Sequence, residues 1–519
     1  MIPQPVIDAY GTLAGWWASA ATSVTPYTDP YFEGLHKLLP EPFFNTAAFL
    51  GFFAAVFALY WAVPRKWRMT RIWLLVVASF HFYASWSRDL AFLVTATTCA
   101  DYLFGRAMGA TKRDRVRFGV MLSSITMNLG ILCYFKYRGF FLNELHDALR
   151  GFGYDPGYGK MDLASVIIPF GISFYTFEAI SYAVDVYRRK VEPERSLPRF
   201  MLFILFFPHL VSGPIVRAGD FLRQARRPKR WNWVRVQVGV QLFLMGVFKK
   251  MAIADRMAVF CNPIFENPQN YNSGAVWLAV LAYALRIYCD FSGYSDMAVG
   301  LAHLFGYKLQ FNFNMPYLSQ NVTEFWRRWH ISLSSWLRDY VFIPLGGSRG
   351  GRLFTYRNLM ITMLLGGLWH GAAWSYVLWG AAHGAMLVVH KQFKDYATAR
   401  PRLDAALQTT VGTGFRILLT FLCVMLCWVL FQPDVGKSLT MFERMFTIQM
   451  GEPLKLHNRS LWYTVLFVGV CHVLVARGLW QRLYTRLPAP VLGFGYAVCL
   501  CAALVLAPDN GTTFIYFTF

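Results

Sequence analysis

A histidine lies inside one of the most apolar stretches of the sequence. Residues 364–384, LLGGLWHGAAWSYVLWGAAHG, are apolar enough to enter a membrane, yet they include His370 and His383. An ionisable side chain inside a membrane marks a functional site by default, although a helix carbonyl or bordering water could also satisfy it. Because a neutral imidazole can act as a base near neutral pH, we take His370 as a candidate base. We expect His383 to lie nearer the helix end, at the membrane interface.

Small and aromatic residues surround His370. Gly366, Gly367 and Gly371 remove bulk from the helix surface. Such residues either let another helix approach or leave room for a ligand, and the sequence leaves both interpretations open. Trp369 and Trp374 would add rigid walls that each carry one polar edge.

A second candidate histidine, His330, follows an aromatic and basic run. The segment EFWRRWHISLSSWLRDY (324–340) predicts one amphipathic helix that lies at the interface or re-enters the membrane. Asn321 or Thr323 could cap its start. His330 could serve chemistry or could be an interfacial histidine that faces water. The apolar positions of the predicted helix are Trp326, Trp329, Leu333, Trp336 and Leu337.

Two aspartates occur in the apolar segment YCDFSGYSDMAVG (288–300). Asp290 and Tyr294 are four residues apart and should share a helix face. Ser292 lies between them, and Asp296 should lie on roughly the opposite side. A lone buried charge is costly, so each carboxylate needs a partner. We expect pairing with arginines such as Arg286, and lining of a polar path is the alternative.

The whole chain has the composition of a polytopic membrane protein. It has 519 residues, of which 56% are hydrophobic and only 15% are charged, whereas soluble domains have about 25% charged residues. A helix needs about 20 mostly apolar residues to cross a bilayer. The sequence therefore predicts an all-α fold with about a dozen membrane-embedded helices, near 44–63, 72–86, 90–108, 117–135, 164–187, 199–216, 234–260, 274–305, 358–390, 413–431, 461–478 and 489–507.

The net charge of +22 comes from basic residues at the ends of these spans. This pattern is typical of cytoplasmic loops and argues against a nucleic-acid surface. Four loops should therefore share the cytoplasmic side. They are 64–71, 111–117, 187–198 and 217–233. The loop at 136–163 should lie on the opposite side.

The rest of the chain suggests one membrane domain over residues 44–519, with no convincing internal repeat. Residues 1–43 form an N-terminal extension in which GTLAGWWASAA (11–21) could be an interfacial helix. The nine cysteines lack metal-site spacing, so we expect no metal site. The Gly-rich GGSRGG (346–351) is best interpreted as a flexible loop, and its backbone N–H groups could also contact the phosphates of a nucleotide-bearing cofactor at the cytoplasmic face.

Several ordered segments resemble the membrane-bound O-acyltransferase (MBOAT) family, in particular its bacterial alginate O-acetylation branch. The resemblance covers roughly residues 44–519. The matching segments are FYTFEAISYAVDVYR, FFPHLVSGPIVR, YCDFSGYSDMAVG, FNFNMPYLSQNVTEFWRRWHISLSSWLRDYVFIPLGG, LWHGAAWSYVLWGAAHG and the C-terminal FIYFTF.

The resemblance implies a funnel-shaped helical bundle around a central tunnel. By the match to LWHGA, His370 corresponds to the central catalytic histidine, and by the match to FWRRWHISL, His330 corresponds to the second catalytic position. Acyl transfer to a hydroxyl needs such a base and a donor to the oxyanion. The residues we expect to line the tunnel or contact substrate are Trp369, Trp374, Asp290, Ser292, Tyr294, Asn321, Trp329 and Trp326.

The resemblance also implies substrates and partners. The acetyl donor would be cytoplasmic acetyl-CoA, with no tightly bound cofactor, and the chain would span the bacterial inner membrane. A periplasmic acetyltransferase of the SGNH, esterase-like type would pass the acetyl group to an exopolysaccharide within a biosynthesis complex.

The sequence leaves two alternative functions open. One is transfer of D-alanine or another acyl group to a cell-envelope polymer, which uses the same family core. The other is a transporter of polysaccharides or lipid-linked sugars. Symmetry-related repeated halves would favour the transporter.

Overall fold

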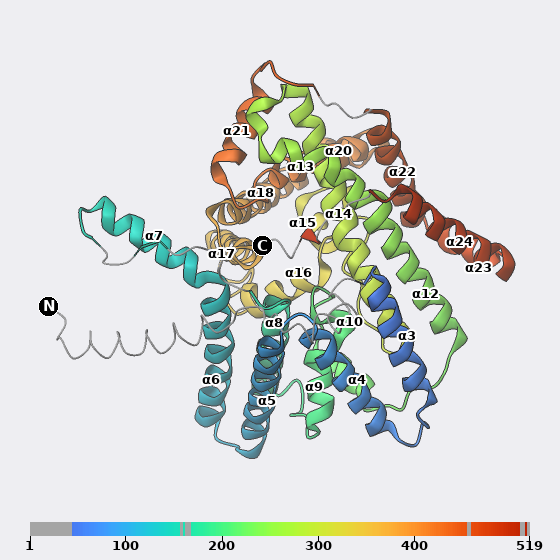
Figure 1. The fold of residues 1–519 in the computed structure, drawn as a ribbon. Coiled ribbons are helices and arrows are strands. Elements are labelled where there is room, and N and C mark those ends of the chain that lie inside the picture. Colours follow the sequence, from blue (N-terminus) through green and yellow to red (C-terminus); the bar gives the residue numbers. More distant parts are fainter. Residues whose placement is uncertain (1–43, 156–158, 161–167, 454–457, 509–513, 516–519) are drawn as a thin grey trace.

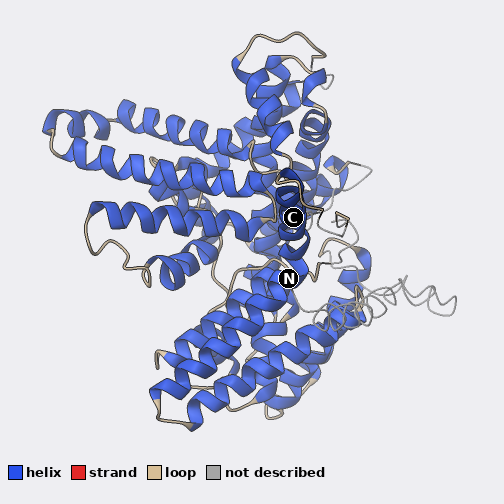
Figure 2. Cartoon of the chain, turned by 90° about the vertical axis from the view of Figure 1, so that its left-hand side faces the viewer, coloured by secondary structure: helices blue, strands red, loops and turns tan. Residues whose placement is uncertain are grey.

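The computed structural model describes residues 44–155, 159–160, 168–453, 458–508 and 514–515. Within these ranges the chain is helical, with no strand and one isolated bridge between Tyr271 and Glu452. Figures 1 and 2 show helices throughout the drawn elements. The predicted all-α polytopic fold is confirmed. The interfacial helix predicted within residues 1–43 lies outside the described residues and stays a prediction.

The first helices follow the predicted apolar spans closely, but the predicted loop at 136–163 is wrong in its first half. The chain does not leave the helix at Lys136, because a π-helical turn, η1, continues α6 into α7. Figure 1 shows α7 projecting away from the other helices. The elements are α3 (Ala47–Ala62), α4 (Arg68–Ala84), α5 (Arg88–Ala110), α6 (Asp114–Leu132), η1 (Cys133–Tyr137) and α7 (Arg138–Gly151).

The middle of the chain is interrupted where proline or close packing requires it. The predicted span at 199–216 is broken after Leu205, and Pro208 then lies in the first turn of a short helix, where its missing N–H costs nothing. The elements are α8 (Ile172–Tyr187), α9 (Leu197–Leu205), α10 (Phe207–Leu210), α11 (Ala218–Ala225), α12 (Trp233–Phe248), η3 (Lys249–Ala254), α13 (Asp255–Glu266), η4 (Pro268–Asn270) and α14 (Ser273–Leu304).

Two predictions about the last third are wrong. The single helix predicted over 324–340 is two short helices and a π-helical turn, and the single span predicted over 358–390 is two helices that separate at residues 371–373. The elements are η5 (Pro316–Leu318), α15 (Val322–Arg328), α16 (Ile331–Leu337), η6 (Arg338–Phe342), α17 (Arg352–His370), α18 (Trp374–Thr398), α19 (Pro401–Gln408), α20 (Thr410–Trp428), α21 (Val435–Phe446), α22 (Asn458–Ala476), α23 (Leu479–Arg486) and α24 (Ala489–Leu506).

Six continuous helical segments of the described chain are long and apolar enough to cross a membrane, fewer than the dozen embedded helices expected. They differ in how much protein surrounds them. In α14, 72% of the most apolar window is buried, against 6% in α24. α14 is therefore a central helix, and α24 presents its side chains outward. The segments are Asp114–Gly151, Trp233–Glu266, Ser273–Leu304, Thr410–Trp428, Arg459–Ala476 and Ala489–Leu506.

Glycines let α12 and α14 pack backbone to backbone. A Cβ added at Gly246 would lie 2.4 Å from the carbonyl oxygen of Gly293, and one added at Gly300 would lie 2.6 Å from that of Gly239. The two pairs are seven residues apart on each helix, so they recur on one face. Small residues at such a seam allow close helix association in a membrane.

The four basic loops lie on one face of the molecule, as predicted. The four loops lie toward the lower part of Figure 1. Three contacts join them in pairs: Arg71 Nη1 donates to Lys229 O at 3.2 Å, Arg189 pairs with Asp114 at 2.9 Å, and Arg226 pairs with Glu194 at 3.0 Å. The four loops therefore meet at one end of the bundle, and their lysines and arginines make this end strongly basic.

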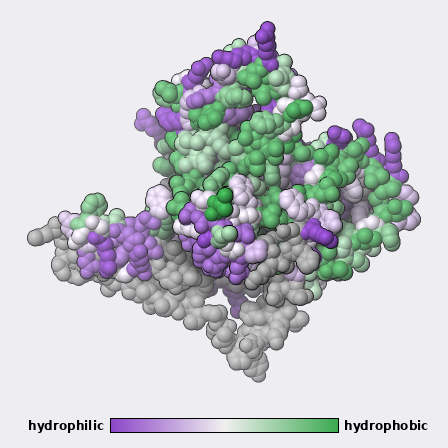
Figure 3. Space-filling model, turned by 90° about the horizontal axis from the view of Figure 1, so that it is seen from above, coloured by the Kyte–Doolittle hydropathy of each residue, from purple (hydrophilic) through white to green (hydrophobic). Residues whose placement is uncertain are grey.

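The outer surface is apolar between the polar ends. Figure 3 shows, from above, hydrophobic side chains over much of the body, with hydrophilic residues at the upper edge, on the left-hand projection and in a patch near the centre. A surface of this kind suits lipid contact, because lipid chains replace water there. Exposed residues of α20, α22 and α24 contribute to it, including Leu418, Leu419, Leu466, Phe467, Phe494 and Leu504.

Candidate active site

His370 is the last residue of α17 and lies in an aromatic enclosure. Its side chain is buried, and its ring centroid is 4.9 Å from that of Trp369, 5.0 Å from that of Trp379 and 5.0 Å from that of Phe431. All three contacts are edge-to-face. The tryptophans come from the two helices that separate directly after His370, so the helix break places the imidazole between them.

His330 lies at the break between α15 and α16, and its backbone has φ +42°. A non-glycine residue with positive φ is uncommon, and such strain is often found at functional sites. The side chain is fully buried. Its ring centroid is 4.6 Å from that of Phe291 and 5.9 Å from that of Trp369. The indole of Trp369 therefore contacts both candidate histidines, which the structure brings together from different helices.

Asn312 fixes the start of α16, although its sequence pattern did not mark it as a candidate. Ile331 N donates to Asn312 O at 2.9 Å, and Ser332 N donates to Asn312 Oδ1 at 3.2 Å. Asn312 Nδ2 donates to Ser295 Oγ on α14 at 3.1 Å. A polar residue in the loop FNFN was the available signal. These bonds hold the backbone on the C-terminal side of His330 against the central helix.

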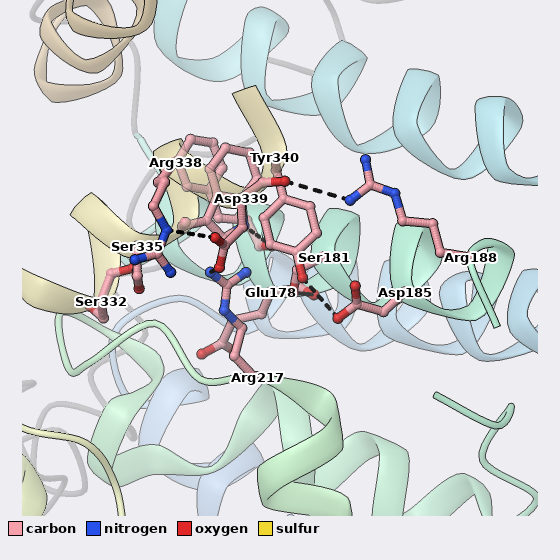
Figure 4. A network of polar contacts seen from close by, with 12 residues as sticks. Glu178, Ser181, Asp185, Arg188, Arg217, Ser332, Ser335, Arg338, Asp339 and Tyr340 are labelled. Carbon is pink, nitrogen blue, oxygen red and sulfur yellow. Dashed lines mark hydrogen bonds and ion pairs between the residues drawn. The ribbon is translucent and has the colours of Figure 1, made fainter. Parts of the chain in front are cut away.

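A network of polar contacts anchors the far side of α16 (Figure 4). Ile215 N donates to Ser332 Oγ at 3.1 Å, and Tyr340 Oη donates to Asp185 at 2.8 Å. Arg217 pairs with Asp339 at 3.4 Å. The network connects the segment that contains His330 to α8 and to the chain around Ile215, close to the basic end of the bundle.

The prediction that His383 lies at the interface is wrong. Its side chain is fully buried, 4.7 Å from Trp379 and 5.1 Å from Trp326 between ring centroids. The physical reason is the length of α18. The helix continues to Thr398, so His383 lies near its middle rather than its end. Within the described residues, neither ring nitrogen of His383 has a hydrogen-bond partner.

Four predicted lining residues are distributed unevenly. Trp326 contacts Trp379 at 5.6 Å between ring centroids, and Trp329 packs against Trp428 at 4.9 Å; both tryptophans are buried. Asn321 caps α15 by accepting from the backbone N–H of Glu324 at 2.8 Å, which confirms the predicted cap. Trp374 differs, because its side chain is 52% exposed and its ring contacts Phe140.

The predicted pairing of Asp290 with Arg286 is wrong. Asp290 Oδ1 lies 2.8 Å from Nζ of Lys250, whereas Arg286 donates to Asn262 Oδ1. The reason is the neighbouring turn η3, which points Lys250 at α14. Asp296, expected to need a partner, pairs with Lys249.

The other two candidates on α14 are also buried. Tyr294 stacks between Phe44 at 4.7 Å and Phe514 at 4.6 Å, and Ser292 has only 1% of its side chain exposed. Asp290, Ser292 and Tyr294 therefore belong to the protein interior.

The glycines near His370 serve helix packing. A Cβ added at Gly367 would lie 2.1 Å from the carbonyl oxygen of Tyr376, and one added at Gly371 would lie 2.1 Å from the Tyr376 ring. Of the two interpretations left open by the sequence, close helix approach therefore holds for these two positions. It brings α18, with Trp379, against the end of α17.

Comparison with known proteins agrees with this arrangement. The family model described as MBOAT, membrane-bound O-acyltransferase family, matches residues 193–432, a range that contains both His330 and His370. The probable alginate O-acetylase AlgI of Pseudomonas aeruginosa is 40% identical over 430 residues, which are 82% of this chain and 78% of that protein. The chain belongs to the membrane-bound O-acyltransferase family.

Two further relatives show how broad the similarity is. The peptidoglycan O-acetyltransferase of Helicobacter pylori is 32% identical over 75% of each chain. The teichoic acid D-alanyltransferase of Streptococcus thermophilus is 32% identical over 50% of this chain and 67% of that protein. The present chain is thus a membrane-bound, multi-pass O-acetyltransferase.

Proposed function

We propose that this MBOAT protein takes an acetyl group from acetyl-CoA at the cytoplasmic face of the bacterial inner membrane and moves it across for O-acetylation of alginate. The observation that carries the proposal is the buried pair His330 and His370, which both contact the ring of Trp369 and lie inside the family match. The relative named as a probable alginate O-acetylase shares more identity over more of the chain than the other two relatives do.

The reaction needs a base and a thioester whose carbonyl carbon the acceptor hydroxyl can reach. In the proposed step, His370 accepts the proton of an acceptor hydroxyl while the hydroxyl oxygen forms a bond to the acetyl carbon. The carbon–sulfur bond breaks, and the departing thiolate takes the proton from the imidazole. His330 positions the donor or assists this proton transfer. The aromatic walls exclude water, which would otherwise hydrolyse the thioester.

The basic end of the bundle supports a cytoplasmic donor side. Positively charged loops favour the cytoplasm, and acetyl-CoA carries negatively charged phosphates. Arg217 belongs to the basic loop 217–233, and the polar network around it (Figure 4) includes Ser332 and Asp339 from the segment that follows His330. A donor that approaches from the basic end would therefore meet the His330 side first.

The final transfer to the polymer is assigned to a separate protein. The described helices form a membrane bundle and include no additional domain that could hold a sugar chain. We therefore propose a periplasmic partner of the SGNH, esterase-like type, within a polysaccharide biosynthesis complex. This chain would hand the acetyl group to a hydroxyl of that partner.

Mass spectrometry of the exopolysaccharide tests the proposal. A strain that lacks this gene should lose acetyl esters from its alginate, and wild-type protein should restore them. His370→Ala should fail to restore them at equal membrane abundance, whereas His81→Ala, an exposed histidine on α4, should restore them fully. Unchanged alginate together with loss of acetyl esters from peptidoglycan, or of D-alanine from another envelope polymer, would replace alginate as the acceptor. Unmodified polymer that stays inside the cell would indicate a transporter.

Purified protein separates enzyme from transporter directly. Wild-type protein in detergent should transfer the acetyl group of acetyl-CoA to an acceptor hydroxyl, and His370→Ala should reduce the rate by about 100-fold or more. Equal rates for the two proteins would remove His370 from the chemistry.

A further inference from the structure

Two neighbouring side chains of η1 donate hydrogen bonds to the C-terminal end of α17, which holds His370. Lys136 Nζ donates to Trp369 O at 2.8 Å and to His370 O at 3.0 Å. Tyr137 Oη donates to Leu368 O at 2.8 Å. The last carbonyls of a helix have no partner within the helix. Three consecutive carbonyls that end at His370 are therefore satisfied by residues about 230 positions earlier in the sequence.

Two of the three contacts of Lys136 Nζ are with the carbonyls at the end of α17. Its third contact is Ser173 Oγ at 3.4 Å, so the three N–H donors of the ammonium have three acceptors. No carboxylate of the described residues lies within ion-pair distance of it. The nitrogen also lies 5.9 Å from the centroid of the Trp369 ring. An ionisable side chain in a membrane-embedded helix is costly and therefore suggests a function.

The π-helical turn η1 explains how both residues reach α17. It spans Cys133–Tyr137 and ends with Lys136 and Tyr137. In a regular α-helix two consecutive side chains point about 100° apart. A π turn inserts one extra residue and rotates the helix surface locally, and such turns often occur at functional sites. Here two consecutive side chains donate to consecutive carbonyls of one helix end.

Hydrogen bonding to the last carbonyls of α17 does not by itself require a lysine. The carbonyl of Leu368 receives a neutral hydroxyl, and an amide or a hydroxyl could serve the others. A cation adds a favourable interaction with the negative end of the α17 dipole. It also acts on the residue that ends the helix, whose ring faces Trp379 and Phe431.

We propose that Lys136 is a positioning residue for acyl transfer, which acts through the backbone of His370. It holds the end of α17 so that the imidazole keeps its place between Trp369 and Trp379, and Tyr137 supports it through Leu368. This role rests on the proposed function of His370 as the base. The effect of the Lys136 hydrogen bonds on the placement of His370 can be measured without any acyl transfer.

Steady-state kinetics of purified variants test the role. Misplacement of a catalytic group by about 1 Å can cost about 100-fold in rate. Lys136→Met should therefore reduce kcat by about 10- to 100-fold while the KM for acetyl-CoA changes less than about threefold. Lys136→Arg keeps the charge and the donors and should recover most of the rate. Tyr137→Phe should lose less, and Lys394→Met, at an exposed lysine outside the four basic loops, should match wild type.

A second measurement reports on His370 without turnover. Acylation of histidines by diethyl pyrocarbonate, followed residue by residue by mass spectrometry, should be several-fold faster at His370 in Lys136→Met than in wild type or Lys136→Arg. The thermal midpoint of each variant shows whether it is folded. Wild-type kcat and wild-type His370 modification in folded Lys136→Met would overturn the inference. Wild-type protein that transfers no acetyl group would instead overturn the proposed function, and the modification rates would still decide whether Lys136 positions His370.

Discussion

Nζ of Lys250 lies 2.8 Å from Oδ1 of Asp290, and both side chains are almost fully buried. The same nitrogen lies 2.7 Å from Oδ1 of Asp255. Lys250 and Asp255 are five residues apart, the spacing of a π turn, and η3 provides that turn between α12 and α13. One ammonium thus connects two carboxylates inside the membrane bundle.

We predict that Lys250→Met destabilises the protein by about 3–5 kcal/mol, because breaking a buried pair leaves an uncompensated charge. Lys249→Met is the matched control. Lys249 pairs with one carboxylate, Asp296, and both side chains keep some exposure, 19% and 16%. The midpoint of thermal unfolding in detergent should therefore fall much further for Lys250→Met. Equal losses would show that the buried cluster has no special weight.

The segment at residues 514–515 is fastened to the same aspartate. Ile515 N donates to Asp290 Oδ2 at 2.7 Å. We predict that Ile515→Pro, which removes this N–H, lowers stability by about 1.5–3 kcal/mol more than Ile515→Ala, which removes only side-chain packing. Thermal midpoints of the two purified variants check this. Matching midpoints would mean that packing, rather than the hydrogen bond, holds the segment.

The positive φ of His330 makes a prediction that separates backbone from side chain. Glycine adopts positive φ without strain, whereas alanine does not. His330→Gly should therefore be more stable than His330→Ala by about 1 kcal/mol. If His330 serves catalysis, both variants should lose activity in the acetyl-transfer assay. A less stable glycine variant would show that the turn is not strained.

The close seam between α12 and α14 predicts a sharp difference between two glycines. Gly293→Ala places a Cβ 2.8 Å from the carbonyl oxygen of Gly246, so it should destabilise the protein by about 1–3 kcal/mol. Gly469 lies in α22 with nothing near its added Cβ, and alanine there should be neutral or should stabilise by about 0.5–1 kcal/mol. Thermal unfolding of both variants measures the difference, and a tolerated Gly293→Ala would mean that the seam is loose.

The sequence by itself determined the class of the fold and the candidate histidines. Apolar span length predicts membrane helices because the bilayer thickness sets it, and the clustering of basic residues predicted one basic end. An imidazole in an apolar run is also informative, because an ionisable group inside a membrane is costly and therefore suggests a function. These signals are local, so His370 and His330 could be singled out without knowing what lies beside them.

Only the tertiary structure decided which residues contact the candidate site residues. The shared contact of His330 and His370 with Trp369, the partner of Asp290 and the burial of His383 depend on which helices meet and where they end. The helix breaks at His330 and after His370, and the π turn before Lys136, change side-chain direction by amounts that periodicity cannot show. The carbonyls of α17 meet a lysine more than 200 residues earlier, and such a contact follows from packing in three dimensions, which no sequence spacing encodes.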